Sequence, residues 1–187
     1  MRVLAIADEV PRADPKDLVR RNRPDLVLTL GDLPGWWMEL LSLTKVPVLG
    51  VLGNHDEDYD LETFGFDDLH LRRSEAGGLS FSGFEGCVEF HRHRKLQYTQ
   101  KQARKLARKL PPASVLVTHC PPFGINDNPD DPAHVGFIAL RDWVTENEPR
   151  YLLHGHTTPD PRTRVHRVGP TKVVWVRGAA VLDLDGA

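Results

Sequence analysis

The sequence predicts an α/β fold with two stacked mixed β-sheets flanked by helices. Near the N-terminus, short apolar runs end at polar residues and alternate with helical segments, which is typical of βαβ units in a parallel sheet. In the last third, apolar and polar residues alternate between turns at Gly169-Pro170 and Gly178, which predicts three antiparallel strands. The strands are expected at 2–7, 25–30, 47–52, 79–84, 114–118 and 151–153, with the antiparallel strands within 162–185.

Capping residues mark two of the expected helices. Asp14 precedes a proline and predicts a helix that ends near residue 21. Thr99, with Gln102 at the capping-box position, predicts a helix that runs to about residue 110. The other helices are expected at 36–43 and 134–148.

Length, charge and cysteine content narrow the class of protein. A chain of 187 residues fits a single domain over residues 1–187. Lys and Arg total 24 against 26 Asp and Glu, so the net charge of −2 gives no whole-molecule argument for nucleic-acid binding. Two cysteines, Cys87 and Cys120, provide no disulfide framework. Without a signal-peptide pattern or an apolar run of roughly 18 residues, we expect a cytoplasmic protein that does not contact membranes.

Polar residues gather at the ends of the expected strands. In open α/β sheets, ligands bind beyond the carboxyl ends of the strands, so residues far apart in the sequence converge there. Carboxylate, amide and imidazole groups together suit a divalent Mn, Fe or Zn ion. The residues at these ends are Asp8, Asp32, Asn54, His55, His119, His154 and His156.

The order of these residues resembles the calcineurin-like metallophosphoesterase superfamily. The motifs are Asp8, Gly31-Asp32, Gly53-Asn54-His55-Asp56, Thr118-His119-Cys120-Pro121-Pro122 and Gly155-His156. The resemblance covers residues 3–185, and the stretch 118–155 is similar to the compact bacterial phosphodiesterase branch. It implies a two-metal site that hydrolyses phosphoesters.

The resemblance also implies a role for each residue. Asp32 would bridge the two metals, Asp8 would bind the first, and Asn54, His119 and His156 would complete the second. His55 would not bind metal; it would stabilise or protonate the leaving-group oxygen, with Asp56 as a candidate to orient it. A metal lowers the pKa of bound water and supplies hydroxide near neutral pH.

The sequence departs from the family pattern at the first metal only. Val10 and Thr158 stand where the family has histidines, and both missing ligands belong to that metal. Glu9 and His154 are the candidate substitutes, with a core or supporting role favoured for His154. We therefore expect one tightly bound ion and a second that binds only at millimolar metal concentration.

Metal-dependent phosphodiester hydrolysis is the expected activity, on a small phosphoester or a nucleotide. Retention of His55 favours an enzyme, whereas a weakened first site also allows a weakly active or inactive phosphate- or nucleotide-binding protein. A nucleic-acid partner is not favoured over a small molecule. The basic residues Lys101, Arg104, Lys105, Arg108 and Lys109 are expected on a solvated helix surface that can also attract anions.

Four further features have simple expected roles. One of Trp36 and Trp37 is expected in the core, and the other can wall the pocket. A polar loop with Asn126, Asp127, Asp130 and Asp131 can close over substrate. The acidic run 56–68 is expected to be a solvated loop, and the histidines expected at the surface without metal are His91, His93 and His166.

Overall fold

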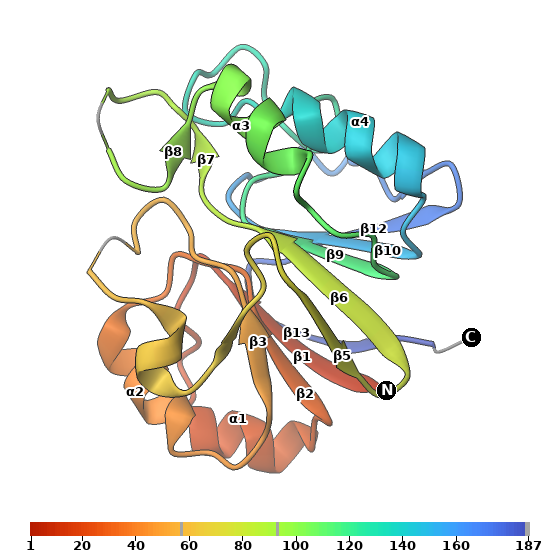
Figure 1. The fold of residues 1–187 in the computed structure, drawn as a ribbon. Helices are drawn as coiled ribbons and strands as arrows, with labels where there is room; N and C mark the ends of the chain where they lie inside the picture. Colours follow the sequence, from red (N-terminus) through yellow and green to blue (C-terminus); the bar gives the residue numbers. More distant parts are fainter. Residues whose placement is uncertain (57, 93, 186–187) are drawn as a thin grey trace.

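A computed structural model describes residues 1–56, 58–92 and 94–185. Two β-sheets stack face to face and helices cover their outer faces, as the sequence predicts (Figure 1). The two ends of the described chain lie side by side, because the N-terminal ammonium of Met1 donates to the carbonyl of Leu184 at 2.9 Å. His93, expected at the surface, lies outside the described residues, as does residue 57 of the acidic run.

The first sheet has the strand order β13-β1-β2-β3-β4. Strands β1 to β4 run parallel, whereas β13 pairs antiparallel with β1. The N-terminal runs therefore form the expected parallel unit, with strand ends within two residues of the expected positions. The strands are β1 (Arg2–Ala7), β2 (Leu26–Thr29), β3 (Val48–Gly50), β4 (Asp67–Asp68) and β13 (Gly178–Asp183).

The second sheet has the order β11-β12-β10-β9-β6-β5. Its central strands β6, β9, β10 and β12 are parallel to their neighbours, and its two edges are antiparallel. The strands are β5 (Arg73–Ala76), β6 (Leu79–Phe84), β9 (Val115–Thr118), β10 (Tyr151–His154), β11 (Arg167–Val168) and β12 (Thr171–Trp175). A separate pair is formed by β7 (Cys87–Val88) and β8 (Gln97–Tyr98).

Helices α1 (Pro15–Asn22) and α2 (Gly35–Ser42) cover the first sheet, and α3 (Gln100–Ala107) and α4 (Ile138–Asn147) cover the second (Figure 1). A short 3₁₀ helix, η1 (Leu61–Phe64), precedes β4. Thr99 forms the expected capping box with Gln102 at the start of α3. Pro15 occupies the first turn of α1, and Asp14 accepts a hydrogen bond from the N–H of Lys16.

The alternation of side chains along β1 explains the layering. Val3, Ala5 and Ala7 belong to the core between the two sheets, while Leu4 and Ile6 pack against Trp37 and the other apolar residues of the α1–α2 layer. A third cluster fills the space between the second sheet and α3–α4. Both faces of β1 are therefore buried, which is why its sequence is an apolar run rather than an alternating one.

The prediction of three antiparallel strands in the tail is wrong. Only β11 and β12 form an antiparallel hairpin, whereas β12 runs parallel to β10 and β13 crosses to the first sheet. Val176 belongs to the core between the sheets, and Gly178 has φ of 65°, so the chain changes sheets at residues 176–178. Alternation alone cannot distinguish a strand that pairs with its predecessor from one that changes sheets.

The helix expected at 134–148 begins only at Ile138. Residues before it are extended: the Phe123 N–H donates to the carbonyl of Phe137, and the Phe137 N–H donates to that of Pro121. Gly136 allows this close pairing, because a Cβ there would lie 2.5 Å from the Phe123 nitrogen. His134 therefore lies in a loop.

Candidate metal centre

The candidate site lies at the carboxyl ends of strands from both sheets. Asp8 follows β1, Asp32 follows β2, His119 follows β9 and His156 follows β10. Asp8, Asp32 and His156 have positive φ angles of 60°, 57° and 63°. Such conformations cost a non-glycine residue about 1–3 kcal/mol and persist only where the surrounding structure enforces them.

Asp32, Asn54 and His119 form a cluster of electron-pair donors. His119 Nε2 lies 3.1 Å from Asn54 Oδ1 and 3.4 Å from Asp32 Oδ2. His119 Nδ1 donates to the carbonyl of Leu30 at 2.8 Å, which directs the Nε2 lone pair toward the two oxygens. His119 is fully buried and Asn54 nearly so, so this cluster requires a cation or a proton at its centre.

The coupled charges of Asp32 and His119 agree with this requirement. Burial lowers the pKa of His119, but the Asp32 carboxylate, the Asp8 charge and the hydrogen bond to Leu30 together raise it. Burial also tends to raise the pKa of Asp32, but His119 holds it below its ordinary value. In the metal-free protein the proton on His119 thus satisfies the cluster, and a divalent ion would replace that proton.

His156 offers a further candidate ligand atom. One ligand atom each from Asp32, His119 and His156 lies within 4.8 Å of the other two, close enough for a shared ion. His156 Nε2 donates to the carbonyl of Ala133 at 2.8 Å, which leaves Nδ1 with its lone pair. Burial lowers the pKa of His156 to about 3, so this imidazole is neutral at pH 7, as a ligand must be. These residues fit a divalent metal.

Asp8 lies at the edge of this centre. Both of its carboxylate oxygens accept the N–H of His156 at 3.0 Å, and burial raises its pKa to about 6. Asp8 lines a pocket of about 260 Å³ with Asp32, His156 and other residues, but it is not one of the group of three that lies within 4.8 Å. Its carboxylate is thus available to an ion or ligand in that pocket.

Two glycines let the loops after β2 and β3 approach each other. Gly31 has φ of 91°, and a Cβ there would lie 2.3 Å from the nitrogen of Gly53 and 2.8 Å from His119 Nδ1. A Cβ on Gly53 would lie 2.1 Å from Asp32 Oδ1. The glycine before each motif is therefore required by the packing of one loop against the other.

His55 is exposed beside the cluster. Its side chain is 69% accessible, and its Nε2 lies 4.0 Å from Asp32 Oδ2. Its backbone N–H donates to Asp32 Oδ1 at 2.9 Å, which fixes the residue at the rim of the centre. The ring is thus placed to contact a ligand rather than to be buried as a metal ligand.

Asp56 has a different role from the one expected. Its carboxylate accepts the backbone N–H groups of Asp32, Leu33 and Gly53 at 2.7, 3.1 and 2.8 Å. Among the described residues, no hydrogen bond joins this carboxylate to the His55 ring. Asp56 therefore fixes the two loops that carry Asp32 and Asn54, and the expectation that it orients His55 is not met.

The first-metal position differs most from the family pattern. Val10 packs against the apolar layer under the first sheet, and the Thr158 hydroxyl accepts a hydrogen bond from Arg177 Nη1 at 2.8 Å. Glu9 faces Arg177, with 3.4 Å between its Oε2 and Arg177 Nε. His154 is fully buried and accepts a hydrogen bond from the Asn126 amide at 3.0 Å, which agrees with the supporting role favoured for it. The sequence reasoning missed Arg177, because it stands outside every motif.

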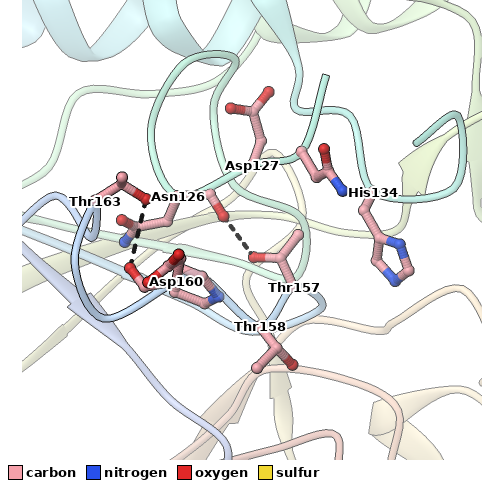
Figure 2. A pocket seen from close by; sticks show the side chains of 9 residues that line it. Asn126, Asp127, His134, Thr157, Thr158, Asp160 and Thr163 are labelled. Carbon is pink, nitrogen blue, oxygen red and sulfur yellow. Dashed lines mark hydrogen bonds between the residues drawn. The ribbon is translucent and has the colours of Figure 1, made fainter. Parts of the chain in front are cut away.

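A polar pocket adjoins the centre. It has a volume of about 430 Å³, and His134, Thr157 and Thr158 line both it and the smaller pocket around Asp8 (Figure 2). The sequence reasoning also missed His134, whose ring centroid lies 5.3 Å from that of His156. The remaining lining residues are Asn126, Asp127, Asn128, Pro159, Asp160 and Thr163.

The loop around Asn126 and Asp127 is held by its own hydrogen bonds. Asn126 Oδ1 accepts the N–H of Val165, and the two oxygens of Asp127 accept the N–H groups of Gly124 and Gly136. These side chains therefore shape the wall of the pocket.

The other predicted features lie away from the cluster or at the surface. Trp37 is buried in the core, as expected of one of the two tryptophans, whereas Trp36 is 59% exposed. A pocket-lining role for Trp36 stays a prediction. Ala103 and Ala107 face inward on α3. The five basic residues of 101–109 are exposed or partly exposed, as are His91 and His166.

Two stacked mixed sheets with Asp, Asn and His at their strand ends define the class of fold as that of the metallophosphoesterases. A family model described as calcineurin-like phosphoesterase matches residues 1–160, so the chain belongs to the calcineurin-like phosphoesterase family. Members of this family bind divalent metals, and the cluster described above is a possible site for one.

Two solved structures share the fold of this chain. One crystal structure superposes with a TM-score of 0.72 at 18% identity, covering 97% of this chain and 94% of the other. The protein TT1561 of Thermus thermophilus superposes with a TM-score of 0.68 at 14% identity, covering 95% of this chain and 89% of that one. Vacuolar Protein Sorting 29 from Cryptosporidium parvum gives a TM-score of 0.48 at 19% identity, with coverages of 93% and 72%. No curated protein matches the sequence.

Proposed function

We propose that the protein is a metal-dependent phosphodiesterase that acts on a small phosphoester or a nucleotide. The observation that carries the proposal is the convergence of His119 Nε2, Asn54 Oδ1 and Asp32 Oδ2, with the exposed His55 ring beside them. A divalent ion bound there would polarise a phosphoryl oxygen and activate water near neutral pH.

The chain's own residues would perform the remaining steps. His55 would donate a proton to the departing oxygen, because its ring is exposed at the rim and its backbone is tied to Asp32. The adjoining pocket would receive the organic part of the substrate, since its hydroxyl, amide and imidazole groups suit a polar, hydroxyl-bearing molecule.

Metal identity and compartment are part of the same proposal. Two imidazoles, one carboxylate and one amide oxygen suit Mn, Fe or Zn better than a hard ion such as Ca²⁺. Cys87 and Cys120 are buried free thiols, which fits a reducing cytoplasm. In the described part of the chain, no helix is long and apolar enough to cross a bilayer.

A non-catalytic phosphate-binding protein is the second candidate, because Val10 and Thr158 replace the two histidines that bind the first metal in the family pattern. Hydrolysis of bis-p-nitrophenyl phosphate with added Mn²⁺ separates the two. We expect turnover by the wild type, its loss in Asp32→Asn and His119→Ala, and no change in His166→Ala, which alters an exposed histidine. Absence of turnover with any divalent metal, together with phosphate binding, would establish the second candidate.

A further inference from the structure

Arg177 lies beside Thr158, the residue that stands where the family pattern has an imidazole ligand. Its guanidinium donates from Nη1 to the hydroxyl of Thr158, the residue that replaces the second histidine of the last motif. Arg177 also lines the 260 Å³ pocket together with Asp8, Asp32 and His156. A fixed positive charge thus shares the pocket in which the first metal of the family would lie.

Strand register fixes this position. Gly178 pairs with Ala7, the residue before Asp8, and Trp175 pairs with His154 at the end of β10. The Val176 N–H donates to the His154 carbonyl at 2.8 Å. Arg177 is therefore held at the crossing from one sheet to the other, between the two strand ends that carry Asp8 and His156.

The guanidinium retains capacity for a ligand. The Arg177 Nη1 donates to the Thr158 hydroxyl, and the Glu9 carboxylate lies 3.4 Å from Arg177 Nε. No other hydrogen bond to this guanidinium occurs among residues 1–56, 58–92 and 94–185. The side chain is 50% accessible. A planar guanidinium that lines a pocket is well suited to phosphate oxygens, whereas a second divalent cation beside it would be repelled.

We propose that Arg177 binds the phosphoryl oxygens of the substrate from the first-metal side, so that the site consists of one metal ion and one guanidinium. The inference rests on the proposed function for its substrate but needs only phosphate binding for its test. Thr158 and Glu9 position the guanidinium. The substitution of Thr158 for histidine thus provides a hydrogen-bond acceptor for Arg177 where the family has a metal ligand.

Titration calorimetry with inorganic phosphate on the Mn²⁺-loaded full chain tests the inference. We expect Arg177→Gln to raise the phosphate Kd by roughly 10- to 100-fold. Arg177→Lys should raise the Kd less, because it keeps the positive charge but loses the two parallel N–H donors of the guanidinium. The matched control is Arg20→Gln, which removes an exposed arginine paired with Asp17 on α1 and should leave the Kd unchanged. Equal Kd values for Arg177→Gln and wild type would overturn the inference.

Two further measurements keep the outcomes distinct. Thr158→Ala retains the charge and removes only the acceptor of Nη1, so it should raise the phosphate Kd by roughly 2- to 5-fold even if Arg177→Gln fails to fold; an unchanged Kd in that variant would count against the inference. Turnover of bis-p-nitrophenyl phosphate is measured in parallel. If the wild type hydrolyses the substrate but Arg177→Gln binds phosphate as tightly as wild type, only the inference about Arg177 is overturned. If phosphate binding depends on Arg177 but no hydrolysis occurs, only the proposed phosphodiesterase activity is overturned.

Discussion

The carboxylate of Asp56 accepts the backbone N–H of Asp32 at 2.7 Å, although 24 residues separate them. The same oxygen accepts the N–H of Gly53 at 2.8 Å, so one buried side chain joins the loops after β2 and β3. Burial raises the pKa of Asp56, and the Gly53 hydrogen bond counteracts this effect. The position of Asp32 therefore depends on a buried carboxylate that accepts the backbone N–H groups of both loops.

Replacement of Asp56 should consequently weaken both the fold and the metal centre. Asp56→Ala leaves three backbone N–H groups without their acceptor, and we expect a loss of about 2–4 kcal/mol in the free energy of unfolding. Mn²⁺ affinity should fall with it. Urea denaturation and metal titration measure the two effects, and the exposed Asp58→Ala is the control. If Asp56→Ala lost only kcat and kept its metal and stability, Asp56 would orient His55 after all.

The second prediction concerns His55. His55→Ala should lower kcat by roughly 10²- to 10⁴-fold at unchanged metal content, because the ring supplies a proton rather than a ligand. The decrease in kcat should be larger for a phenyl phosphodiester than for the p-nitrophenyl one. Phenolate is the poorer leaving group and therefore depends more on protonation. His166→Ala is the matched control. Loss of the bound ion from His55→Ala would show that His55 is a ligand.

The third prediction concerns Glu85, a carboxyl outside the metal centre whose side chain is only 12% exposed. Burial raises its pKa from 4.5 to about 7, although the Tyr98 hydroxyl donates to it. His70 lies 3.5 Å away through Nε2, while its Nδ1 accepts the N–H of Glu85 and so cannot carry a proton without losing that bond. Because His70 is neutral, it does not compensate for the free-energy cost of burying the charged Glu85 carboxylate.

The sign of the pH effect follows from the raised pKa. Between 4.5 and about 7 the folded protein holds a proton that unfolded Glu85 has released, so stability falls as pH rises through this window. Glu85→Gln removes the titration, and its stability relative to wild type should rise between about pH 5 and pH 8 by up to roughly 3 kcal/mol. Urea denaturation across this range measures it, with the exposed Glu75→Gln as control. A constant difference between Glu85→Gln and wild type would contradict the burial argument.

The candidate ligands of the centre could be predicted from the sequence, whereas Arg177 and His134 beside them could not. Asp32, Asn54 and His119 follow buried strands, and the carboxyl ends of parallel strands meet at one edge. Arg177 and His134 come together with them only because the chain changes sheets after β12 and because residues before α4 pair in an extended form. Both placements depend on pairing between distant segments, which no local pattern encodes.

The final prediction concerns the number of bound ions. Wild-type protein dialysed against a weak chelator should retain one Mn²⁺ per chain, because the first-metal position offers Asp8 and the shared Asp32 beside the Arg177 guanidinium. Val10→His with Thr158→His should still retain one ion while Arg177 is present, and adding Arg177→Ala should raise the content to two. Elemental analysis measures each protein, and Asp8→Ala should cost less metal than Asp32→Ala. If the wild type retained two ions, the one-metal site would be overturned. If the wild type retained one ion but the variant with Val10→His and Thr158→His retained two, Arg177 would not exclude the second ion.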